Sequence, residues 1–527
     1  MTAKSKRFII IWCILFVLGW IMIINSNKDL FFGNHFSNDV NFKILSTIEN
    51  KDMEATLLKL ANENDIKLTI DYAEDLEIVS KINSGEEYNA IWMSNSLWSY
   101  QIENAYLKNS KSTSITPVVM GIKKSKAQEL GFINTKIRNV DILNAIKDGK
   151  LKYVMSSAVK TNTGASAYLG FLNSLAGSPE VLKSEMLQDQ TLKNNMVNFF
   201  NGLERVSGTE EFLEEMFLKS NNYEAVIAAE TSLININKQL EEQNKEPLYL
   251  IYPEDGVAIS DSPFIYIDSE KEEMFKIFQD YLLSEEGQNE LLSKGRRTWY
   301  GGVNSNTPKD IFNPEWGIDT NDYLIPLKYP SKKVIAEATN LYIEEFRKPS
   351  HTIFLLDYSG SMYGEGHYDL VNAMSYILDY KEASKEYIQF SSKDKITVIP
   401  FTAYYTDIWS TNNGKETEDL ILKIKSKKAN GGTNIYDPAR KAIDILASES
   451  NDYTKTIILM TDGQSEDYYS TLKDHYYATN TNIPIYSIMF GSSSELQLEQ
   501  IAKLTNAKVF DGRTNLLEAF KEVRGFN

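Results

Sequence analysis

Apolar residues along this chain follow two alternating patterns. Short apolar runs of strand length, such as residues 66–72, alternate with stretches in which apolar residues recur every three or four positions, such as residues 53–62. The first pattern predicts β-strands and the second predicts amphipathic helices. Strands that alternate with helices favour largely parallel sheets covered by helices, so we expect an α/β protein.

The alternation forms three series. The first begins at residue 42, and the second follows the apolar stretch at 116–123, which leads away from the first unit. We therefore expect two α/β lobes with the chain passing between them, and such a junction leaves a cleft. The third series occupies residues 350–527, after an irregular connector and a predicted helix at 334–347 that packs on a lobe and stops at Pro349.

Oxygen-bearing side chains stand where the third series predicts loops. The apolar runs at 353–356 and 457–460 each lead into such a loop, and a Gly-Gly pair opens another loop before a helical pattern. The carboxyl ends of parallel strands meet at one edge of a sheet, so we expect these loops to converge. Carboxylates and hydroxyls are the ligands that a hard divalent cation prefers, although Asp and Ser also crowd into ordinary turns. The side chains are Asp357, Ser359, Ser361, Thr433 and Asp462.

With these segments in this order, residues 350–527 resemble a von Willebrand factor type A (VWA) domain with a complete metal-ion-dependent adhesion site. The resemblance implies a doubly wound, Rossmann-like sheet. It implies hydroxyl ligands from Ser359, Ser361 and Thr433, and negative charge from Asp357 and Asp462, for Mg²⁺ or for another divalent cation such as Mn²⁺ or Ca²⁺. It also implies an open coordination position that a carboxylate of a protein partner fills.

Residues 41–305 resemble the two-lobed bacterial extracellular solute-binding proteins, of the periplasmic-binding-protein type 2 class. The resemblance rests on the order of the elements and on short polar phrases, such as the one at 161–166 that opens a helix. It implies that a small solute binds in the cleft. The candidate ligand-binding residues are Thr47, Asn95, Thr163 and Glu230.

Each cleft candidate also has a structural interpretation. Free N–H groups at the start of the helix near Thr163 favour an anion or a polar solute, but Thr163 or Ser166 serves equally as an ordinary helix cap. Thr47 and Asn95 lie at strand ends, where turn formation is the simpler interpretation. Glu230 favours a cationic ligand, so the sequence leaves the charge of the ligand open.

The N-terminus carries one apolar, uncharged run at residues 8–24. Its length is close to the minimum for a transmembrane helix, and Lys4, Lys6 and Arg7 precede it. By the positive-inside tendency we expect a single-pass anchor in the cell membrane, with a cytoplasmic N-terminus and an extracellular main body. A cleaved signal peptide is the alternative, but no small-residue cleavage site follows the run.

Composition narrows the class of protein. The net charge of −17 argues against nucleic acid as a partner, and the single cysteine, Cys13, excludes an intrachain disulfide. Abundant Lys, Asn and Ile favour a bacterial source. The length of 527 residues suits several units. We expect a cytoplasmic tip with the anchor, a stalk, a solute-binding-like domain, a connector with a helix, and a VWA domain, at residues 1–25, 26–40, 41–305, 306–349 and 350–527.

These expectations combine into a functional hypothesis. The chain is a membrane-anchored extracellular bacterial protein that binds a divalent metal and engages a protein partner, and it is not an enzyme. The alternative is a transport-associated or sensing receptor whose cleft binds a small solute. Metal-dependent catalysis is disfavoured because no base or nucleophile is placed beside the metal motif.

Overall fold

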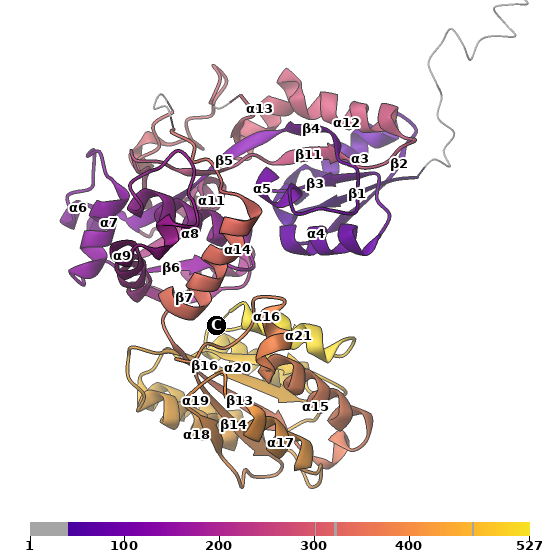
Figure 1. Cartoon of the computed structure of the whole chain (residues 1–527), viewed down its shortest axis with the longest axis vertical. Helices are drawn as coiled ribbons and strands as arrows, with labels where there is room; N and C mark the ends of the chain where they lie inside the picture. The colour runs from indigo at the N-terminus through magenta and orange to yellow at the C-terminus, as the bar shows by residue number, and fades with distance from the viewer. Residues whose placement is uncertain (1–40, 301, 321–323, 466–467, 527) are drawn as a thin grey trace, which may run out of the picture.

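The computed structural model describes residues 41–300, 302–320, 324–465 and 468–526. Figure 1 shows three α/β bodies in this part of the chain: two lobes side by side, and a C-terminal domain against one of them. The predicted membrane span at 8–24 and the stalk at 26–40 lie outside the described residues. Within the described ranges, no helix combines the length and the apolar composition needed to cross a membrane.

Lobe I contains a five-stranded sheet with the order β2-β1-β3-β11-β4. β1 pairs in parallel with β2 and β3, whereas β11 runs antiparallel to β3 and β4. Its elements are β1 (Asn41–Ser46), η1 (Ile48–Met53), α3 (Glu54–Glu63), β2 (Lys67–Tyr72), α4 (Asp75–Ser84), β3 (Ala90–Trp92), α5 (Ser96–Ser99), β4 (Lys108–Ser112), β11 (Pro263–Tyr266), α12 (Glu272–Leu283) and α13 (Glu285–Ser293).

Lobe II contains a seven-stranded sheet in which the long strand β5 pairs antiparallel with β8, β9, β10 and β12. β6 lies in parallel between β7 and β8. The elements are β5 (Ser114–Lys123), α6 (Lys124–Glu129), α7 (Asn139–Lys147), β6 (Tyr153–Ser156), α8 (Asn162–Leu175), η2 (Met186–Gln188), α9 (Gln190–Asn201), β7 (Leu203–Ser207), α10 (Glu210–Lys219), β8 (Ala225–Ala229), α11 (Glu230–Glu242), β9 (Leu248–Ile251), β10 (Ala258–Ser260) and β12 (Arg297–Thr298).

The chain crosses between the lobes at neighbouring segments. β4 continues into β5 through Thr113, and β10 continues into β11 through residues 261–262. The backbone N–H of Thr113 donates to the carbonyl of Ser262 at 3.1 Å, so the two crossings run side by side. Paired crossings of this kind can absorb a rotation of one lobe against the other.

The C-terminal domain contains a six-stranded sheet with the order β15-β14-β13-β16-β17-β18, parallel except for the edge strand β15. This is the doubly wound arrangement expected from the sequence. Its elements are β13 (Ser350–Asp357), η5 (Gly360–Met362), α15 (Glu365–Leu378), α16 (Tyr380–Ser384), β14 (Lys395–Phe401), β15 (Trp409–Thr411), α17 (Glu418–Ser426), α18 (Tyr436–Ala447), β16 (Thr454–Thr461), α19 (Tyr469–Thr479), β17 (Ile485–Met489), α20 (Glu495–Leu504), β18 (Val509–Asp511) and α21 (Leu516–Arg524).

Alternation along β13 explains why helices cover both faces of this sheet. Phe354 and Leu356 join the core under α15, α17 and α21, whereas Ile353 and Leu355 join the core under α18, α19 and α20. Successive side chains of a strand point to opposite faces, so a continuous apolar run needs cover on both sides. Every residue of β13 is buried.

The predicted connecting helix is present and packs on lobe II. It consists of α14 (Lys332–Leu341) and one π-helical turn, η4 (Tyr342–Phe346). The Tyr168 hydroxyl of α8 donates to the Ala338 carbonyl at 2.7 Å, and its ring lies against Tyr342, with ring centroids 5.5 Å apart. The connector is therefore a packed element of lobe II.

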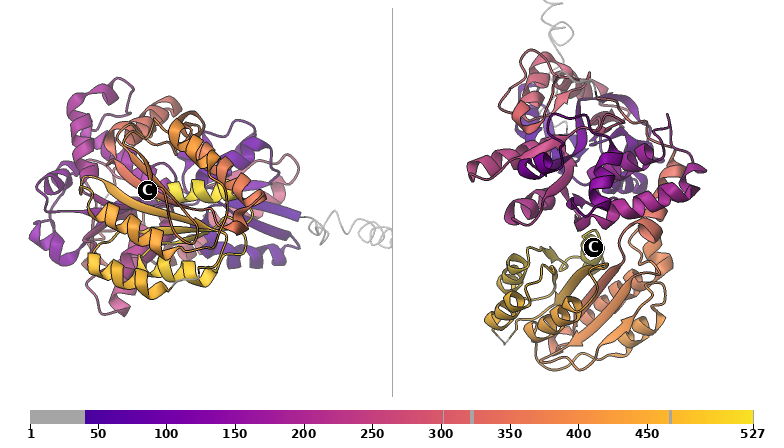
Figure 2. Two further views of the ribbon diagram at one scale, coloured as in Figure 1. Left: turned by 90° about the horizontal axis from the view of Figure 1, so that it is seen from below. Right: turned by 90° about the vertical axis from the view of Figure 1, so that its left-hand side faces the viewer.

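Lobe II also contacts the C-terminal domain directly, and the right-hand view of Figure 2 shows the C-terminal domain next to the lobes. Phe526, at the end of the described chain, lies against Phe212 of α10, with ring centroids 5.4 Å apart. The buried Arg205 guanidinium donates to the Tyr486 hydroxyl at 2.9 Å and to the Asn506 carbonyl at 2.6 Å. One continuous apolar core runs from lobe II into the C-terminal domain.

Among the described helices of nine or more residues, four were not predicted from the sequence: α9, α10, α13 and α19. In α10, Thr209 precedes Glu210-Glu211, and Phe212, Leu213, Met216 and Phe217 follow at helical spacing; all four apolar side chains are buried. The pattern is that of a capped amphipathic helix, so the signal was present in the sequence.

Candidate functional site

The carboxyl edge of the C-terminal sheet brings together the loops that follow β13 and β16. The Ser359 and Ser361 hydroxyl oxygens lie 3.0 Å apart, and Ser361 donates to the Asp462 carboxylate at 2.7 Å. Asp357 ends β13, and its carboxylate accepts the Ser359 N–H at 2.7 Å. Residues 101 positions apart in the sequence therefore meet in one polar cluster, as the motif predicts.

The third loop, before α18, reaches the same cluster. A Cβ atom added to Gly463 would stand 2.7 Å from the Thr433 hydroxyl, so Thr433 lies directly against the loop of Asp462. The Gly360 N–H donates to the Gly431 carbonyl at 2.8 Å, which ties the first loop to the third. Gly431 has a φ of +81°, a conformation that side chains of L-residues rarely adopt.

Electrostatics at this edge favour a bound cation. Burial raises the pKa of Asp357, hydrogen bonds from Thr461 and Ser359 lower it in part, and the charge of Asp462 raises it further. Burial likewise raises the pKa of Asp462, against a hydrogen bond from Ser361. A cation between the two carboxylates would favour the ionised form of both.

The set of oxygen donors at this edge matches a hard cation better than a transition metal. Within the described residues, no group of three or more His, Cys, Asp or Glu side chains is placed to hold a metal ion. Here two carboxylates combine with the hydroxyls of Ser359, Ser361 and Thr433, and Mg²⁺ needs few carboxylates because it retains water ligands. The residues present therefore fit Mg²⁺.

This edge lies at the end of the domain remote from lobe II. β13 follows directly on the connector and runs from Ser350 to Asp357, while Tyr486 at the opposite edge contacts Arg205 of lobe II. Eight residues of β-strand span about 26 Å. Ser361 is exposed, so the cluster opens to solvent.

Exposed tyrosines occupy the loops at this edge. Tyr363 follows η5, Tyr404 follows β14 and Tyr468 follows the Asp462 loop, with 84%, 62% and 75% of their surfaces exposed. Their neighbours Tyr405 and Tyr469 are partly buried and pack on the core. Exposed aromatic side chains are enriched in surfaces that bind proteins.

A second candidate site is a cavity between the two lobes. It has a volume of about 410 Å³, opens to solvent and is lined by polar side chains of both lobes, including Asn50, Ser94, Asn162, Thr163 and Glu210. Polar groups that converge from two lobes are the usual walls of a solute site.

Of the four residues predicted to bind a ligand in the cleft, only Thr163 lines the cavity. Thr163 lines this cavity and is almost fully buried, but the cap of α8 is Thr161, whose hydroxyl accepts the Gly164 N–H at 3.0 Å. The expectation that Thr163 or Ser166 caps this helix is therefore wrong, because the helix begins earlier, at Asn162.

The other three candidates have structural partners instead. The Thr47 hydroxyl accepts a hydrogen bond from Asn50 at 3.1 Å, and Asn95 caps α5 by accepting the Leu97 N–H at 2.9 Å. The Glu230 carboxylate accepts two hydrogen bonds of 2.8 Å from Arg297, while its neighbours Ala229 and Thr231 line the cavity. Their predicted ligand roles are not supported, since each of these side chains forms hydrogen bonds with other residues of the chain.

Comparison with known families matches both halves of the chain. The von Willebrand factor type A domain model matches residues 352–522, and the bacterial extracellular solute-binding protein model matches residues 50–297. The chain joins a solute-binding-like domain to a VWA domain. Both resemblances stated from the sequence are thereby confirmed at the level of the domain.

Curated relatives match the VWA part. A von Willebrand factor A domain-containing protein of Dictyostelium discoideum is 28% identical over 174 residues, which is 32% of this chain and 18% of that protein. An uncharacterized protein of Methanocaldococcus jannaschii is 28% identical over 160 residues, which is 30% of this chain and 34% of that protein. The chain thus spans less than half the length of these relatives.

Solved structures resemble each part at low identity. The periplasmic binding protein AfuA of Actinobacillus pleuropneumoniae is 14% identical and covers 58% of this chain and 99% of its own, with a TM-score of 0.42. A von Willebrand factor type A structure from Catenulispora acidiphila is 19% identical and covers 34% of this chain and 43% of its own, with a TM-score of 0.29.

Sequence reasoning missed two polar residues at these sites. In the VWA domain, the Thr461 hydroxyl donates to the second carboxylate oxygen of Asp357 at 2.5 Å. In the solute-binding-like domain, Glu210 lines the cavity at the start of the unpredicted helix α10. Thr461 is the last residue of its strand and directly precedes Asp462, and this position could have identified it from the sequence.

Proposed function

We propose that this chain is a membrane-anchored extracellular bacterial protein whose VWA domain binds Mg²⁺, or another divalent cation such as Mn²⁺ or Ca²⁺, and thereby engages a protein partner. The observation that carries the proposal is the polar cluster of Ser359, Ser361 and Asp462 at an exposed edge, with Asp357 and Thr433 beside it. The anchor rests on the apolar run at residues 8–24.

The residues of this edge offer two kinds of ligand to a cation. Ser359, Ser361 and Thr433 offer neutral oxygens, and Asp357 and Asp462 offer negative charge. Thr461 and the backbone of Ser359 hold both oxygens of Asp357 in place. The bound cation supplies a Lewis-acid position that accepts an anionic oxygen, such as a partner's carboxylate.

The surroundings of the edge support binding to a protein. Tyr363, Tyr404 and Tyr468 provide exposed aromatic area around the cluster, and the edge faces away from lobe II, so another protein can approach it. The proposed role is binding without catalysis, since the Ser359 and Ser361 hydroxyls bond each other and Asp462 at distances that suit a ligand shell.

Metal binding is tested by thermal unfolding of the purified full chain with EDTA, with Mg²⁺ and with Mn²⁺. A ligand at about 100 times its dissociation constant stabilises the folded state by about 2.7 kcal/mol, so Mg²⁺ should raise the Tm. Asp462→Asn and Ser361→Ala should abolish this rise, whereas Asp474→Asn, on the exposed surface of α19, should retain it. A parent chain that unfolds at the same temperature in EDTA and in Mg²⁺ contradicts the proposal.

A second candidate function is a transport-associated or sensing receptor that captures a small solute. The polar cavity of about 410 Å³ between the lobes favours it. The two functions are compatible, because the cavity and the metal edge belong to different domains. A Tm rise of the full chain with a solute in the presence of EDTA assigns the effect to the cavity.

A further inference from the structure

Glu210 is a buried carboxylate in the wall of the inter-lobe cavity. It begins α10, only 7% of its surface is exposed, and it lines the cavity. Neither of its carboxylate oxygens has a hydrogen-bond partner among the described residues. A buried carboxylate without partners is costly, so Glu210 requires either a proton or a cationic group from outside the chain.

Two hydroxyls lie near Glu210, and one of them, that of Thr161, donates elsewhere. Ser156 and Thr161 lie close enough to lower its pKa, yet Thr161 donates to Ser156 at 2.8 Å and lies 3.1 Å from the Ser157 carbonyl. Neither hydroxyl forms a well-aligned bond to the carboxylate. Burial and the charge of Glu49 raise the pKa of Glu210 to about 7.

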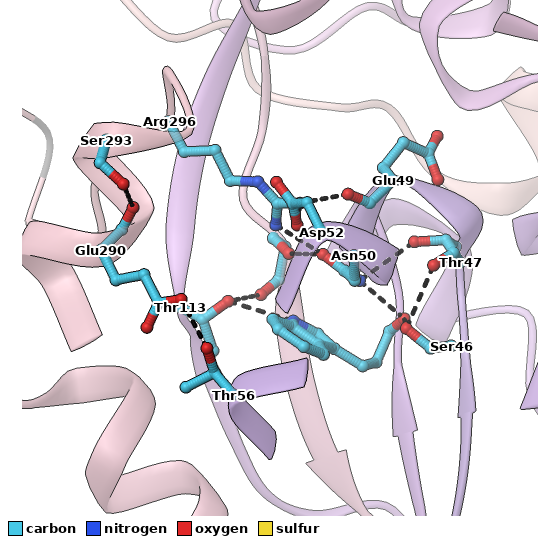
Figure 3. A network of polar contacts seen from close by, with 12 residues as sticks. Ser46, Thr47, Glu49, Asn50, Asp52, Thr56, Thr113, Glu290, Ser293 and Arg296 are labelled. Atoms are coloured by element: carbon cyan, nitrogen blue, oxygen red, sulfur yellow. Dashed lines mark hydrogen bonds and ion pairs between the residues drawn. The ribbon is translucent and has the colours of Figure 1, made fainter. Parts of the chain in front are cut away.

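Glu49 reaches the same cavity from lobe I. One of its carboxylate oxygens is buried without a hydrogen-bond partner among the described residues. Figure 3 shows this carboxylate pointing away from Arg296, which instead binds Asp52 at 2.6 Å and the Asn50 side chain at 2.7 Å. Carboxylate oxygens without hydrogen-bond partners among the described residues thus line the cavity from both lobes.

The charges around the cavity leave an excess of negative charge. Arg296 is neutralised by Asp52, and the remaining cations, Lys51 and Lys294, are exposed at the rim. The lining carboxylates are Glu49, Asp52, Glu210, Glu211 and Glu214. Burial raises the pKa of the neighbouring Glu74, and the charges of Glu49 and Glu210 raise it further, so like charges from the two lobes repel one another.

We propose that the cavity binds a small organic cation with N–H donors, a primary ammonium or a guanidinium, held between Glu210 of lobe II and Glu49 of lobe I. The inference rests on the solute-binding role proposed above and assigns the chemical class of the solute. Such a cation supplies the missing donors and cancels the repulsion between the lobes.

Two other classes of cation fit the lining less well. A transition-metal ion suits it poorly, since no group of three or more His, Cys, Asp or Glu side chains among the described residues is placed to hold one. A quaternary ammonium is recognised by aromatic rings, and none of the described lining residues is aromatic. The hydroxyls and amides of Asn162, Thr163 and Asn235 suit a cation that hydrogen-bonds.

The proposal is tested by thermal shift and calorimetric titration of the full chain in EDTA with 1,4-diaminobutane and agmatine. 1,4-Bis(trimethylammonio)butane matches the charge of 1,4-diaminobutane without N–H donors, while sulfate, a sugar phosphate and a neutral sugar represent other solute classes. We expect the two amines to raise the Tm in a concentration-dependent way and the other solutes to leave it unchanged.

Variants of the lining carboxylates test whether the amines bind in the cavity. Glu210→Gln and Glu49→Gln should each weaken amine binding at least about tenfold, because a desolvated charge pair is lost. Glu215→Gln, on the same helix but exposed and paired with Lys219, should bind as the parent does. Without ligand, Glu210→Gln should fold normally and be more stable than the parent chain. A loss of amine binding in this variant therefore cannot result from misfolding.

The outcomes distinguish this inference from the function on which it rests. Stabilisation by an anion or a sugar, with no response to amines, overturns the cationic ligand and leaves a solute-binding protein. Amine binding that Glu210→Gln and Glu49→Gln leave unchanged also overturns the inference. Failure of every solute class to shift the Tm overturns both.

Discussion

At the scale of single residues, both sites depend on carboxylates held in places where their charge is costly. Burial raises the pKa of Asp357 and Asp462 at the metal edge, and of Glu210 in the cavity. By contrast, the buried Glu230 is fully paired by Arg297 and needs nothing from outside. A partner within the chain distinguishes a structural carboxylate from a binding one.

Glu210 makes the stability of the ligand-free chain depend on pH. Burial raises its pKa to about 7 in the folded state from an ordinary value of 4.5, so protonation stabilises the fold fully below pH 4.5, and this stability is lost as the pH rises through 7. Glu210→Gln should therefore raise the free energy of unfolding at pH 8, by on the order of 2 kcal/mol. Denaturant titration at pH 8 and pH 4 measures the difference, which should nearly vanish at pH 4.

Thr461 should tune the metal edge without binding the cation. Its hydroxyl bonds Asp357, so Thr461→Val removes one of the two donors that hold this carboxylate. Loss of such a supporting group typically weakens metal affinity about 10- to 100-fold. Mg²⁺ titration of the Tm should show this weakening. Unchanged Mg²⁺ affinity in a folded Thr461→Val chain would contradict the role.

At the scale of elements, the connector joins the domains through ion pairs as well as by packing, and the pair of Arg347 with Asp394 is the most buried of them. Arg347 follows the π-helical turn, and its guanidinium bonds Asp394 in the loop before β14 at 2.9 Å. Asp394 also accepts the Ser350 N–H at 2.6 Å, where β13 begins. These bonds, with the nearby positive charge, hold the pKa of Asp394 below its usual value despite burial.

Asp394→Ala should therefore be among the most destabilising changes in the VWA domain. It leaves the Arg347 guanidinium buried without its partner, and breaking a buried pair costs about 3–5 kcal/mol. Calorimetry of the full chain measures the loss. The double variant Asp394→Ala with Arg347→Met should recover part of the stability. If it does not, the destabilisation comes from the lost backbone contacts of Asp394 and not from the unpaired guanidinium.

At the scale of the whole molecule, the VWA domain packs on lobe II through the edge opposite to its proposed metal site. α10 contributes to both regions, since Glu210 lines the cavity and Phe212 packs on Phe526. Lys160, which precedes the cap of α8, donates to the Lys521 carbonyl of α21. Cavity and VWA domain thus share elements of lobe II, and Figure 1 shows the C-terminus at their junction.

Phe526→Ala should loosen this junction. The side chain is almost fully buried and fills the space above Gly208, and truncation of a buried Phe costs about 3–5 kcal/mol. Calorimetry should show the cooperative unfolding of the parent chain separating into two transitions, with Phe526→Leu intermediate. A single transition in Phe526→Ala, shifted no more than in Phe526→Leu, would mean that the connector alone couples the domains.

The sequence by itself determined the local elements and the metal motif of this protein. Strand and helix periods depend on neighbouring residues, and the parallel sheet brings the loop ends of β13 and β16 together wherever such strands pair. The tertiary structure alone decided which polar groups in the cleft are occupied. Glu230 meets Arg297 across 67 residues, whereas Glu210 meets no partner among the described residues. Hydrogen-bond satisfaction between distant segments leaves no local pattern, and for this reason the candidate ligands of the cleft changed once the fold was known.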